Sequence, residues 1–327
     1  MLSVFLWIST VEAIGLITLP ICYRLLPKLR DRGYSVSKPL GILIIAYISW
    51  ALSVTHILPS VQLTIAAIFI TLTAISSWCL WGHRHGFLAF ISRERSSILT
   101  SQIIFFSVYL GWILYRVYDP GIGHTEQPMD HAFLNASIRS SLGPPEDPWL
   151  RGESISYYYF GYWMMGVLSE FSGTPSQISY NLALALIAAM GAMGMFGLVY
   201  NMVKSDTNTR KLAILAGVTA SFLLVVSANM EGLLEFIRSN GMGHQTFWEW
   251  VEIKKNPTDV SSVYLSASTA NNLAESWYPN DHWWWFRATR VIDTFDGSRW
   301  IDMTIQEFPF FSFLLGDLHP HVMSIPL

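Results

Sequence analysis

Long apolar segments separated by short polar ones make up most of the chain as far as Ala228. A helix of roughly 20 mainly apolar residues is long enough to cross the hydrocarbon core of a bilayer. The segments that reach or approach this length are Leu2–Leu26, Pro39–Leu58, Val61–Trp81, Ile98–Val117, Ile178–Val203 and Leu212–Ala228. The pattern therefore predicts an all-α polytopic membrane protein, and Phe308–Leu327 is expected to start a further membrane segment.

Basic residues are concentrated in the polar segments that follow the first and the third apolar segments. They are Lys28, Arg30, Arg32 and Lys38 in one, and His83, Arg84, His85, Arg93 and Arg95 in the other. Loops rich in Lys and Arg stay in the cytoplasm, so the N-terminus and the loop from Tyr118 to Ser156 are expected outside. The first apolar segment is too long for a cleaved signal peptide, and no basic residue precedes it. We therefore expect a multi-pass protein of the plasma membrane.

The segment Tyr157–Phe171 is ambiguous, because it is apolar but short and carries Glu170 near its end. If it crossed the membrane, the next span would leave Lys204, Arg210 and Lys211 outside, against the charge rule. We therefore expect a juxtamembrane helix that lies at the outer face.

This reading divides the chain into five parts. They are four transmembrane helices (1–117), a large external loop with juxtamembrane helices (118–172), a transmembrane helix pair (173–228), a Trp-rich external region (229–307) and the start of a further membrane segment (308–327). The chain ends inside an apolar stretch, and we therefore expect it to be a fragment of a longer protein.

Composition supports a membrane protein and excludes some partners. Hydrophobic residues make up 52% and charged residues only 13%, about half the roughly 25% charged fraction of soluble domains. Fourteen Trp and fourteen Tyr suit an interfacial aromatic belt. The net charge of −3 gives no support for a nucleic-acid partner, and two cysteines inside apolar segments provide no disulfide framework.

The longest polar interruption, Glu126–Tyr162, holds the first candidate residues. A helix is predicted over Met129–Ser140, which places Asp130 and His131 in its first turn. Asp130 could be a catalytic carboxylate or only a charge that the helix dipole favours. Glu231 follows the outward span Leu212–Ala228 and is expected on the same face. Together, Asp130 and Glu231 could hold a divalent cation, Mg²⁺ or Mn²⁺, or take a proton from an acceptor.

Two further groups of candidates lie near the end of the chain. Asp317, His319 and His321 occur in the sequence GDLHPH, where the proline prevents a regular helix. Ionisable residues in a membrane segment tend to be functional, and this group could bind a metal or hydrogen-bond a sugar or phosphate. Arg287 and Arg290 follow three tryptophans and are either headgroup anchors or a clamp for phosphate.

Other ionisable and aromatic residues are expected to be structural. The Tyr157-Tyr158-Tyr159 run is interpreted mainly as an interfacial anchor, with sugar stacking as the alternative. Glu12 and His56, both in apolar surroundings, are expected to pair inside the helix bundle.

Five motifs identify a resemblance. They are PMDHAFLNASI, PPEDPWLRGESISYYYFGY, ANMEG, WFRATRVI and EFPFFSFLLGDLHPHV. From Pro128 to its end the chain resembles the "YYY" membrane proteins of archaea and Chloroflexi, a largely uncharacterised family named for the triple tyrosine. That family is more remotely similar to the GT-C superfamily of polytopic glycosyltransferases.

The GT-C resemblance implies a transmembrane bundle with external loops and a sugar donor carried on polyprenyl phosphate. The acidic motif of the first external loop corresponds to Asp130, with Asp147 nearby, and a second acidic position corresponds to Glu231. The resulting hypothesis assigns catalysis to Asp130, Glu231 and His131. It assigns substrate and lipid-phosphate binding to Arg287, Arg290, Asp147, Trp149 and Tyr158, and a metal to Asp130, Glu231, Asp317, His319 and His321. The sequence departs from the GT-C pattern because His131, not a second acidic residue, follows Asp130, and because three spans precede the usual first one.

The function best supported by the sequence is a membrane glycosyltransferase that uses a polyprenyl-phosphate sugar donor within the membrane lipid. A transporter or flippase of lipid-linked saccharides would show repeated spans and charges along a path through the membrane. The chain has no internal repeat, and its charges gather at one face. A non-catalytic membrane subunit is the third possibility, which the density of acidic, His and Arg residues at one face disfavours.

Overall fold

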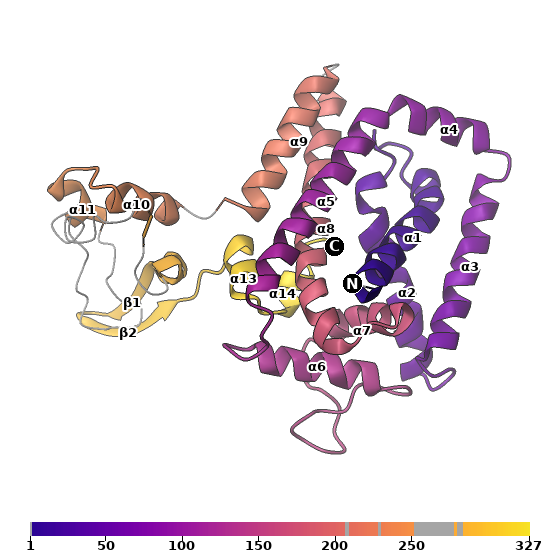
Figure 1. Ribbon diagram of the computed structural model, residues 1–327, viewed down its shortest axis with the longest axis horizontal. Helices are drawn as coiled ribbons and strands as arrows, with labels where there is room; N and C mark the ends of the chain where they lie inside the picture. The colour runs from indigo at the N-terminus through magenta and orange to yellow at the C-terminus, as the bar shows by residue number, and fades with distance from the viewer. Residues whose placement is uncertain (1, 207–208, 228–229, 252–277, 280–283) are drawn as a thin grey trace. The chain divides into compact units, whose positions relative to one another are not determined.

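The computed structural model describes residues 2–206, 209–227, 230–251, 278–279 and 284–327. The chain forms two compact units: Met1–Val225 with Leu315–Leu327, and Val226–Leu314. The first unit is a bundle of helices (Figure 1). Its helices are α1 (Leu2–Leu25), α2 (Ser37–Val54), α3 (Gln62–Leu80), α4 (Arg84–Arg93), α5 (Arg95–Tyr118), α6 (Gln127–Arg139), α7 (Phe160–Ser172), α8 (Ser176–Asp206), α9 (Arg210–Val225) and α14 (Pro320–Met323).

Five of the described helical segments are long and apolar enough to cross a membrane. They are Leu2–Leu25, Tyr34–Val54, Gln62–Leu80, Arg95–Tyr118 and Ser176–Ser205. The prediction of a helical, multi-pass membrane protein is therefore confirmed at this level. Helix α9 has 16 residues and is not among the five. Its predicted counterpart, Leu212–Ala228, ends outside the described residues, so a crossing there stays a prediction.

Helix α8 is the centre of the bundle. Of its most apolar window, 78% is buried, against 22–50% in the other four candidate spans. It packs against α5 and α9 and against the 3-10 helix Tyr34–Val36. At Gly197 any Cβ would overlap the side chain of Ser35, so only glycine lets that 3-10 helix lie against α8. Small residues have this role in the packing of membrane helices, where close approach of backbones supplies the dispersion energy.

The basic loops assigned to one side of the membrane lie together at one end of the bundle, near α4 (Figure 1). Arg24 Nη1 lies 2.6 Å from His83 Nε2, and Arg210 Nη2 lies 3.7 Å from Glu94 Oε1. Helix α6 and the start of the loop after it lie at the opposite end. The predicted grouping of loops therefore agrees with the fold. Which end faces the cytoplasm stays a prediction.

Helix α7, expected from Tyr157–Phe171 as a juxtamembrane helix at the outer face of the membrane, is enclosed by other helices of the bundle, and its place relative to the membrane stays a prediction. Residues from Tyr162 to Ser169 are all buried, and α7 packs against α1, α2, α3, α6 and α8. The helix is apolar around its whole circumference, and such a helix is stable only when it is enclosed. Its 13 residues are too few to span a bilayer, as expected from the sequence.

The structure differs from the expectations drawn from the sequence at two ionisable residues, Lys38 and His56. Lys38, expected in a cytoplasmic loop, is 3% exposed in the first turn of α2. Its Nζ lies 3.3 Å from Glu12 Oε1 and donates to Gln102 Oε1 at 2.6 Å. Glu12 is therefore paired within the bundle, as predicted. His56 is not: it is exposed after α2, with a left-handed φ of 57°.

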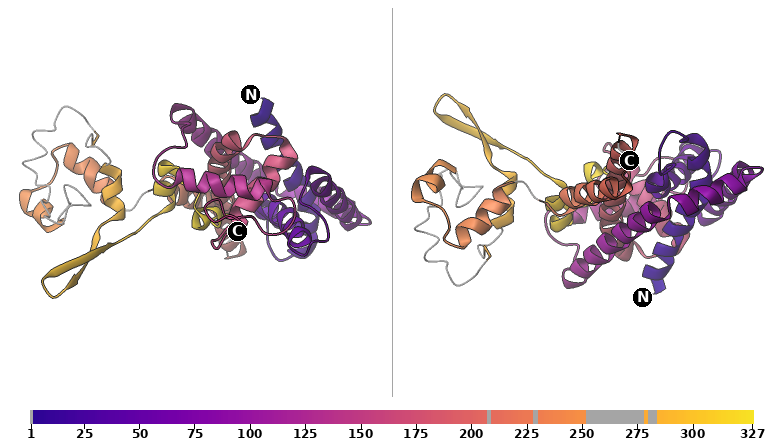
Figure 2. Two further views of the ribbon diagram at one scale, coloured as in Figure 1. Left: turned by 90° about the horizontal axis from the view of Figure 1, so that it is seen from below. Right: turned by 90° about the horizontal axis from the view of Figure 1, so that it is seen from above.

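The second unit combines short helices with one β-hairpin. Its elements are α10 (Met230–Ser239), α11 (Gln245–Val251), the 3-10 helix Trp284–Thr289, β1 (Ile292–Asp296), β2 (Arg299–Thr304) and α13 (Pro309–Leu315). Strands β1 and β2 are antiparallel, with Ile292 opposite Thr304, and form the long hairpin in Figure 2. This hairpin is the departure from an all-α fold. Gly297, with φ of 60°, makes the turn that joins the strands.

The last residues do not form one long helix. Helix α13 ends at Leu315, Gly316 has φ of 79°, and α14 begins only at Pro320. A residue that precedes proline avoids the helical region, and His319 accordingly adopts φ −66°, ψ 148°. The predicted further membrane segment is thus two short helices joined by an extended turn, and its entry into the membrane stays a prediction.

Candidate functional site

Asp130 is fully buried at the start of α6. The helix begins at Gln127, with Pro128 in its first turn, and places Asp130 on the face that packs into the bundle, as predicted for the first turn. The Tyr162 hydroxyl on α7 donates to Asp130 Oδ1 at 2.5 Å. The Tyr180 hydroxyl on α8 lies 3.5 Å from Asp130 Oδ2. Three helices therefore converge on one carboxyl group.

Burial raises the pKa of Asp130 from 3.8 to about 6. The hydrogen bond from Tyr162 and the charge of His319 oppose this shift, and the charge of Asp317 adds to it. A carboxyl group with such a pKa is ionised at neutral pH but is a stronger base than an exposed aspartate. A general base works best when its pKa lies near the working pH.

The GDLHPH segment lies directly against this carboxylate. Tyr180 connects them, because its hydroxyl accepts a hydrogen bond from Leu318 N at 3.2 Å and lies 3.0 Å from Gly316 O. Thr125 Oγ1 donates to Asp317 Oδ1 at 2.5 Å. Burial raises the pKa of Asp317 as well. The structure thus brings two buried carboxyl groups, from distant parts of the sequence, to the N-terminal end of α6.

His319 is held at the edge of the same cluster. Its Nε2 lies 2.7 Å from Glu126 Oε2 and 3.9 Å from Asp317 Oδ2. The ring of His321 lies 5.3 Å from that of His319. Glu126 is the partner of His319, so a metal ion at His319 would have to displace this hydrogen bond. The metal ligands inferred from the sequence therefore stay a prediction.

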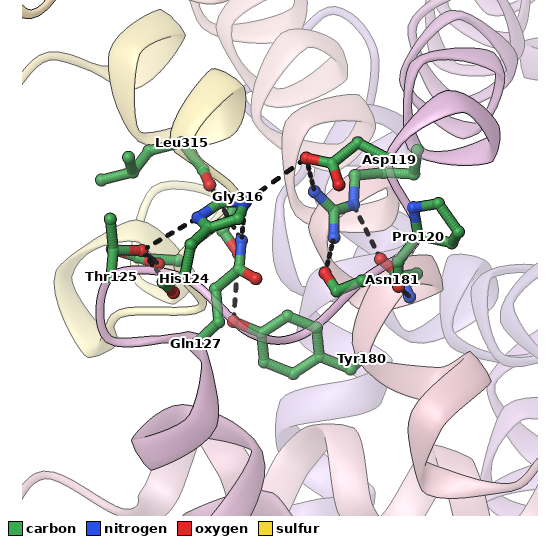
Figure 3. Close-up of polar contacts among 12 residues, drawn as sticks. Asp119, Pro120, His124, Thr125, Gln127, Tyr180, Asn181, Leu315 and Gly316 are labelled. Atoms are coloured by element: carbon green, nitrogen blue, oxygen red, sulfur yellow. Dashed lines mark hydrogen bonds and ion pairs between the residues drawn. The ribbon is translucent and has the colours of Figure 1, made fainter.

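Further polar contacts, among them those of Gln127, Asn181 and Leu315, support the segment (Figure 3). Arg116 is 3% exposed in the last turn of α5, donates from Nε to Asn181 Oδ1 at 2.7 Å, and donates from Nη2 to Gly121 O at 3.1 Å. Gln127 Nε2 donates to Leu315 O at 3.0 Å. At Gly316 a Cβ would come within 2.7 Å of Arg116 Nη1 and 2.9 Å of Gln127 Nε2. Gly316 also has a left-handed φ of 79°, which favours glycine where the chain turns toward Asp130.

His131 points to a different side of α6 from Asp130. Its ring meets that of Tyr180 edge-on at 5.9 Å, and Asn135 Nδ2 lies 3.2 Å from its Nε2. Burial lowers the pKa of His131, which favours the neutral form of the ring. His131 is therefore a neighbour of the carboxylate cluster with no direct bond to Asp130.

The loop after α6 borders two cavities in the first unit. A polar cavity of about 1090 Å³ lies between α6 and the loop and is lined in part by Asp147 and Trp149. An apolar groove of about 760 Å³ is lined by Tyr47, Trp50, Tyr157–Phe160, Met164 and His321 among others. Tyr158, predicted to bind substrate, is 77% exposed and lines this groove.

The remaining candidates lie in the second unit. Arg287 is 5% exposed and its Nε donates to Glu235 Oε1 at 2.5 Å, while Arg238 Nη2 pairs with Glu235 Oε2 at 2.8 Å. Burial and the neighbouring Glu235 charge raise the pKa of Glu231. Arg290 packs over the Phe286 ring and donates to Thr289. Arg287 thus belongs to a buried ion cluster, and its pairing with Arg290 on a phosphate stays a prediction.

The structure therefore brings Asp130, Asp317 and His319 together. Asp147 and Trp149 line the polar cavity, and Tyr158 lines the apolar groove. Six residues that contribute to the cluster were not among the site residues proposed from the sequence: Arg116, Thr125, Glu126, Gln127, Tyr162 and Tyr180. The sequence did mark Arg116 as a candidate, because a charged residue within an apolar span tends to be functional. Nothing in the sequence distinguishes the two tyrosines from the other twelve.

The fold and the cluster define a polytopic helical membrane protein with a buried polar site at one end of its bundle. Comparison with protein families identifies its group. The chain belongs to an uncharacterized membrane protein family, DUF2298, whose pattern matches residues 44–327. No curated protein and no solved structure matches the chain.

Proposed function

We propose that this protein is a membrane glycosyltransferase of the GT-C type, which transfers a sugar from a polyprenyl-phosphate donor to an extracytoplasmic acceptor. The observation that carries the proposal is the buried carboxyl group of Asp130, with a pKa of about 6 and a hydrogen bond from Tyr162. Strongly shifted carboxyl groups in an enclosed polar site are candidates for acid–base chemistry.

In this proposal Asp130 is the general base. It takes the proton of the acceptor hydroxyl as the acceptor oxygen forms a bond to the anomeric carbon, and the bond from that carbon to the donor phosphate breaks. The polyprenyl phosphate leaves with the bonding electrons. Tyr162 orients the carboxylate, and the neutral ring of His131 stays beside Tyr180 as a second polar group.

The apolar groove suits the lipid part of the donor. Exposed aromatic side chains and Met164 line it, and apolar contact of this kind stabilises a bound hydrocarbon chain in proportion to the area removed from water. His321 lies at the groove, and its ring is 5.3 Å from that of His319 in the carboxylate cluster. A lipid in the groove would therefore have its phosphate end within reach of imidazole groups.

Other parts of the proposal rest on the sequence resemblance. Glu231 would be the second acidic residue, and Arg290, with Arg287, would contact the lipid phosphate. Alternatively to its role as the base, Asp130 would be a metal ligand, and a divalent cation, Mg²⁺ or Mn²⁺, would be held by Asp130, Glu231, Asp317, His319 and His321. The site would face outward from the plasma membrane, with the N-terminus and the large loops on that side.

A transporter or flippase of lipid-linked saccharides is the alternative, and a non-catalytic subunit is the third. The Lys38–Glu12 ion pair inside the bundle favours transport, because such charges can mark a path through the membrane. However, Gln102 forms hydrogen bonds with both Lys38 and Glu12, and Lys38 Nζ lies over the Phe105 ring. These contacts suit a structural ion pair. A flippase would move a labelled lipid-linked saccharide across proteoliposomes with no acceptor present.

The test is sugar transfer by Asp130→Asn, which keeps the shape of the side chain and removes the charge. Membranes that contain the variant should transfer labelled sugar from a polyprenyl-linked pool about 10²–10⁴-fold more slowly. The same change at Asp296, an exposed carboxylate in β1, is the matched control and should leave transfer unchanged. If Asp130→Asn keeps near-normal transfer while Glu231→Gln loses it, the base is Glu231 and the assignment is wrong.

A further inference from the structure

The walls of the polar cavity beside α6 are held in place by hydrogen bonds within the protein. Asp147 N donates to Glu153 O at 2.8 Å, and Ile155 N donates to Pro145 O at 2.9 Å, so the loop closes on itself. Gly143 N donates to Ser53 O at 3.0 Å, which fastens the loop to α2. The other wall is α6. A cavity between a helix and a fastened loop is pre-formed, which lowers the entropic cost of binding.

The charge of the lining argues against an anionic ligand. Arg139 and Arg151 contribute two positive charges, while Glu146, Asp147 and Glu153 contribute three negative ones. A phosphate-binding site carries an excess of arginine or lysine, and this cavity does not. Its polar groups of both signs match a neutral ligand with many hydroxyl groups, which both donate and accept hydrogen bonds.

Several of these groups are available to a ligand. Among the described residues, the side chains of Arg139, Arg151 and Glu153 have no hydrogen-bond or ion-pair partner. Asn135 also lines the cavity and uses its Nδ2 toward His131. The Asp147 side chain, by contrast, already has hydrogen-bond partners within the loop. Its Oδ1 accepts hydrogen bonds from Trp149 N at 2.8 Å and from Leu150 N at 3.1 Å. Its role is to shape the turn that presents Trp149.

Trp149 supplies an aromatic face. It is 63% exposed and its ring meets Phe133 edge-on, with centroids 5.4 Å apart. Phe133 in turn lies 5.6 Å from the ring of Tyr162, which donates to Asp130. An exposed tryptophan whose ring is held by a second aromatic ring provides a stacking surface for the apolar face of a sugar ring. The same aromatic contacts connect this surface to the buried carboxylate.

We propose that the cavity lined by Arg139, Trp149, Arg151 and Glu153 binds the sugar rings of a neutral saccharide acceptor. This inference rests on the proposed function, because it names the acceptor of that site. The volume of about 1090 Å³ lies just above the roughly 300–1,000 Å³ of ligand pockets, which leaves room for several sugar rings. Asp147 and Trp149 then serve the acceptor and not the lipid phosphate.

The test is direct binding of short oligosaccharides, which needs no catalysis. The full chain is placed in nanodiscs, because glycoside detergents would compete, and is titrated calorimetrically with maltotetraose, mannotetraose and chitotetraose. At least one should bind. Trp149→Ala should weaken that binding about three- to tenfold, and Trp149→Phe should restore part of it. Trp81→Ala, at a tryptophan that is 83% exposed on another loop, is the matched control and should bind as the unchanged protein does.

The outcomes separate this inference from the proposed function. Asp130→Asn should lose transfer and keep saccharide binding, since its carboxylate is not in the cavity lining. Saccharide binding that depends on Trp149 in a protein without transferase activity would refute the proposed function and keep the inference. Absence of binding by all three saccharides, equal binding by Trp149→Ala, or binding of a peptide in their place would overturn it.

Discussion

Asp130→Asn is expected to make the folded protein more stable at neutral pH while it abolishes transfer. The carboxyl group is fully buried and ionises only at about pH 6 in the folded protein, against 3.8 for an ordinary aspartate. Asparagine has the same shape and can still accept the hydrogen bond from Tyr162. It cannot carry the buried charge, and so it removes the cost of keeping that charge out of water.

The size of the effect follows from the pKa shift. The unfolded chain loses the proton of Asp130 near pH 3.8, and the folded protein keeps it up to about pH 6. The contribution of this group to stability is therefore fully present below pH 3.8 and is lost as the pH rises through 6. A shift of about two units corresponds to about 3 kcal/mol. The variant should thus match the unchanged protein at pH 4 and exceed it by about 3 kcal/mol at pH 7.

The assay is chemical unfolding in lipid discs at a series of pH values, followed by tryptophan fluorescence. Asp296→Asn is the control, because the same change at an exposed position should shift the curve little at any pH. The reasoning is refuted if Asp130→Asn is destabilised at pH 7, or if the difference between the two proteins does not grow between pH 4 and pH 7. Either result would mean that the carboxylate is stabilised by a positive partner when it ionises.

Three further predictions concern the packing at Gly316, the two arginines of the second unit and the orientation in the membrane. Gly316→Ala should lower the thermal midpoint and slow transfer, because its Cβ would come within 2.7 Å of Arg116 Nη1 and its φ of 79° is strained for alanine; normal values of both would contradict the packing. Arg287→Ala should cost about 1.5–3 kcal/mol in unfolding experiments, because buried Glu235 loses a charge-assisted hydrogen bond at Oε1 and keeps only its pairing with Arg238. Arg290→Ala should fold normally and weaken donor binding about ten- to a hundredfold. A cysteine at Ser141 should react with an impermeant thiol reagent in intact cells and one at Ser92 should not; the reverse pattern would invert the predicted orientation.

The apolar pattern by itself determined where the membrane helices lie. Each predicted span before Tyr118 matches a described helix to within a few residues, because uninterrupted apolar stretches in lipid have to satisfy their backbone groups within one helix. Local sequence also determined α6, since Pro128 and Asp130 are typical of a helix start. The irregular backbone at His319 followed from Pro320 in the same way. These are consequences of a few neighbouring residues.

Tertiary structure decided what those helices bring together. Asp130 meets Asp317 and His319 only because Tyr180, Gln127 and Gly316 fasten two segments that are almost 190 residues apart in the chain. The burial of Lys38 with Glu12, the enclosure of α7 and the ion pair of Arg287 with Glu235 likewise depend on long-range contacts. A sequence shows the type and spacing of charged groups. Their partners and their access to water, which set their pKa values and their chemistry, arise only when the helices pack.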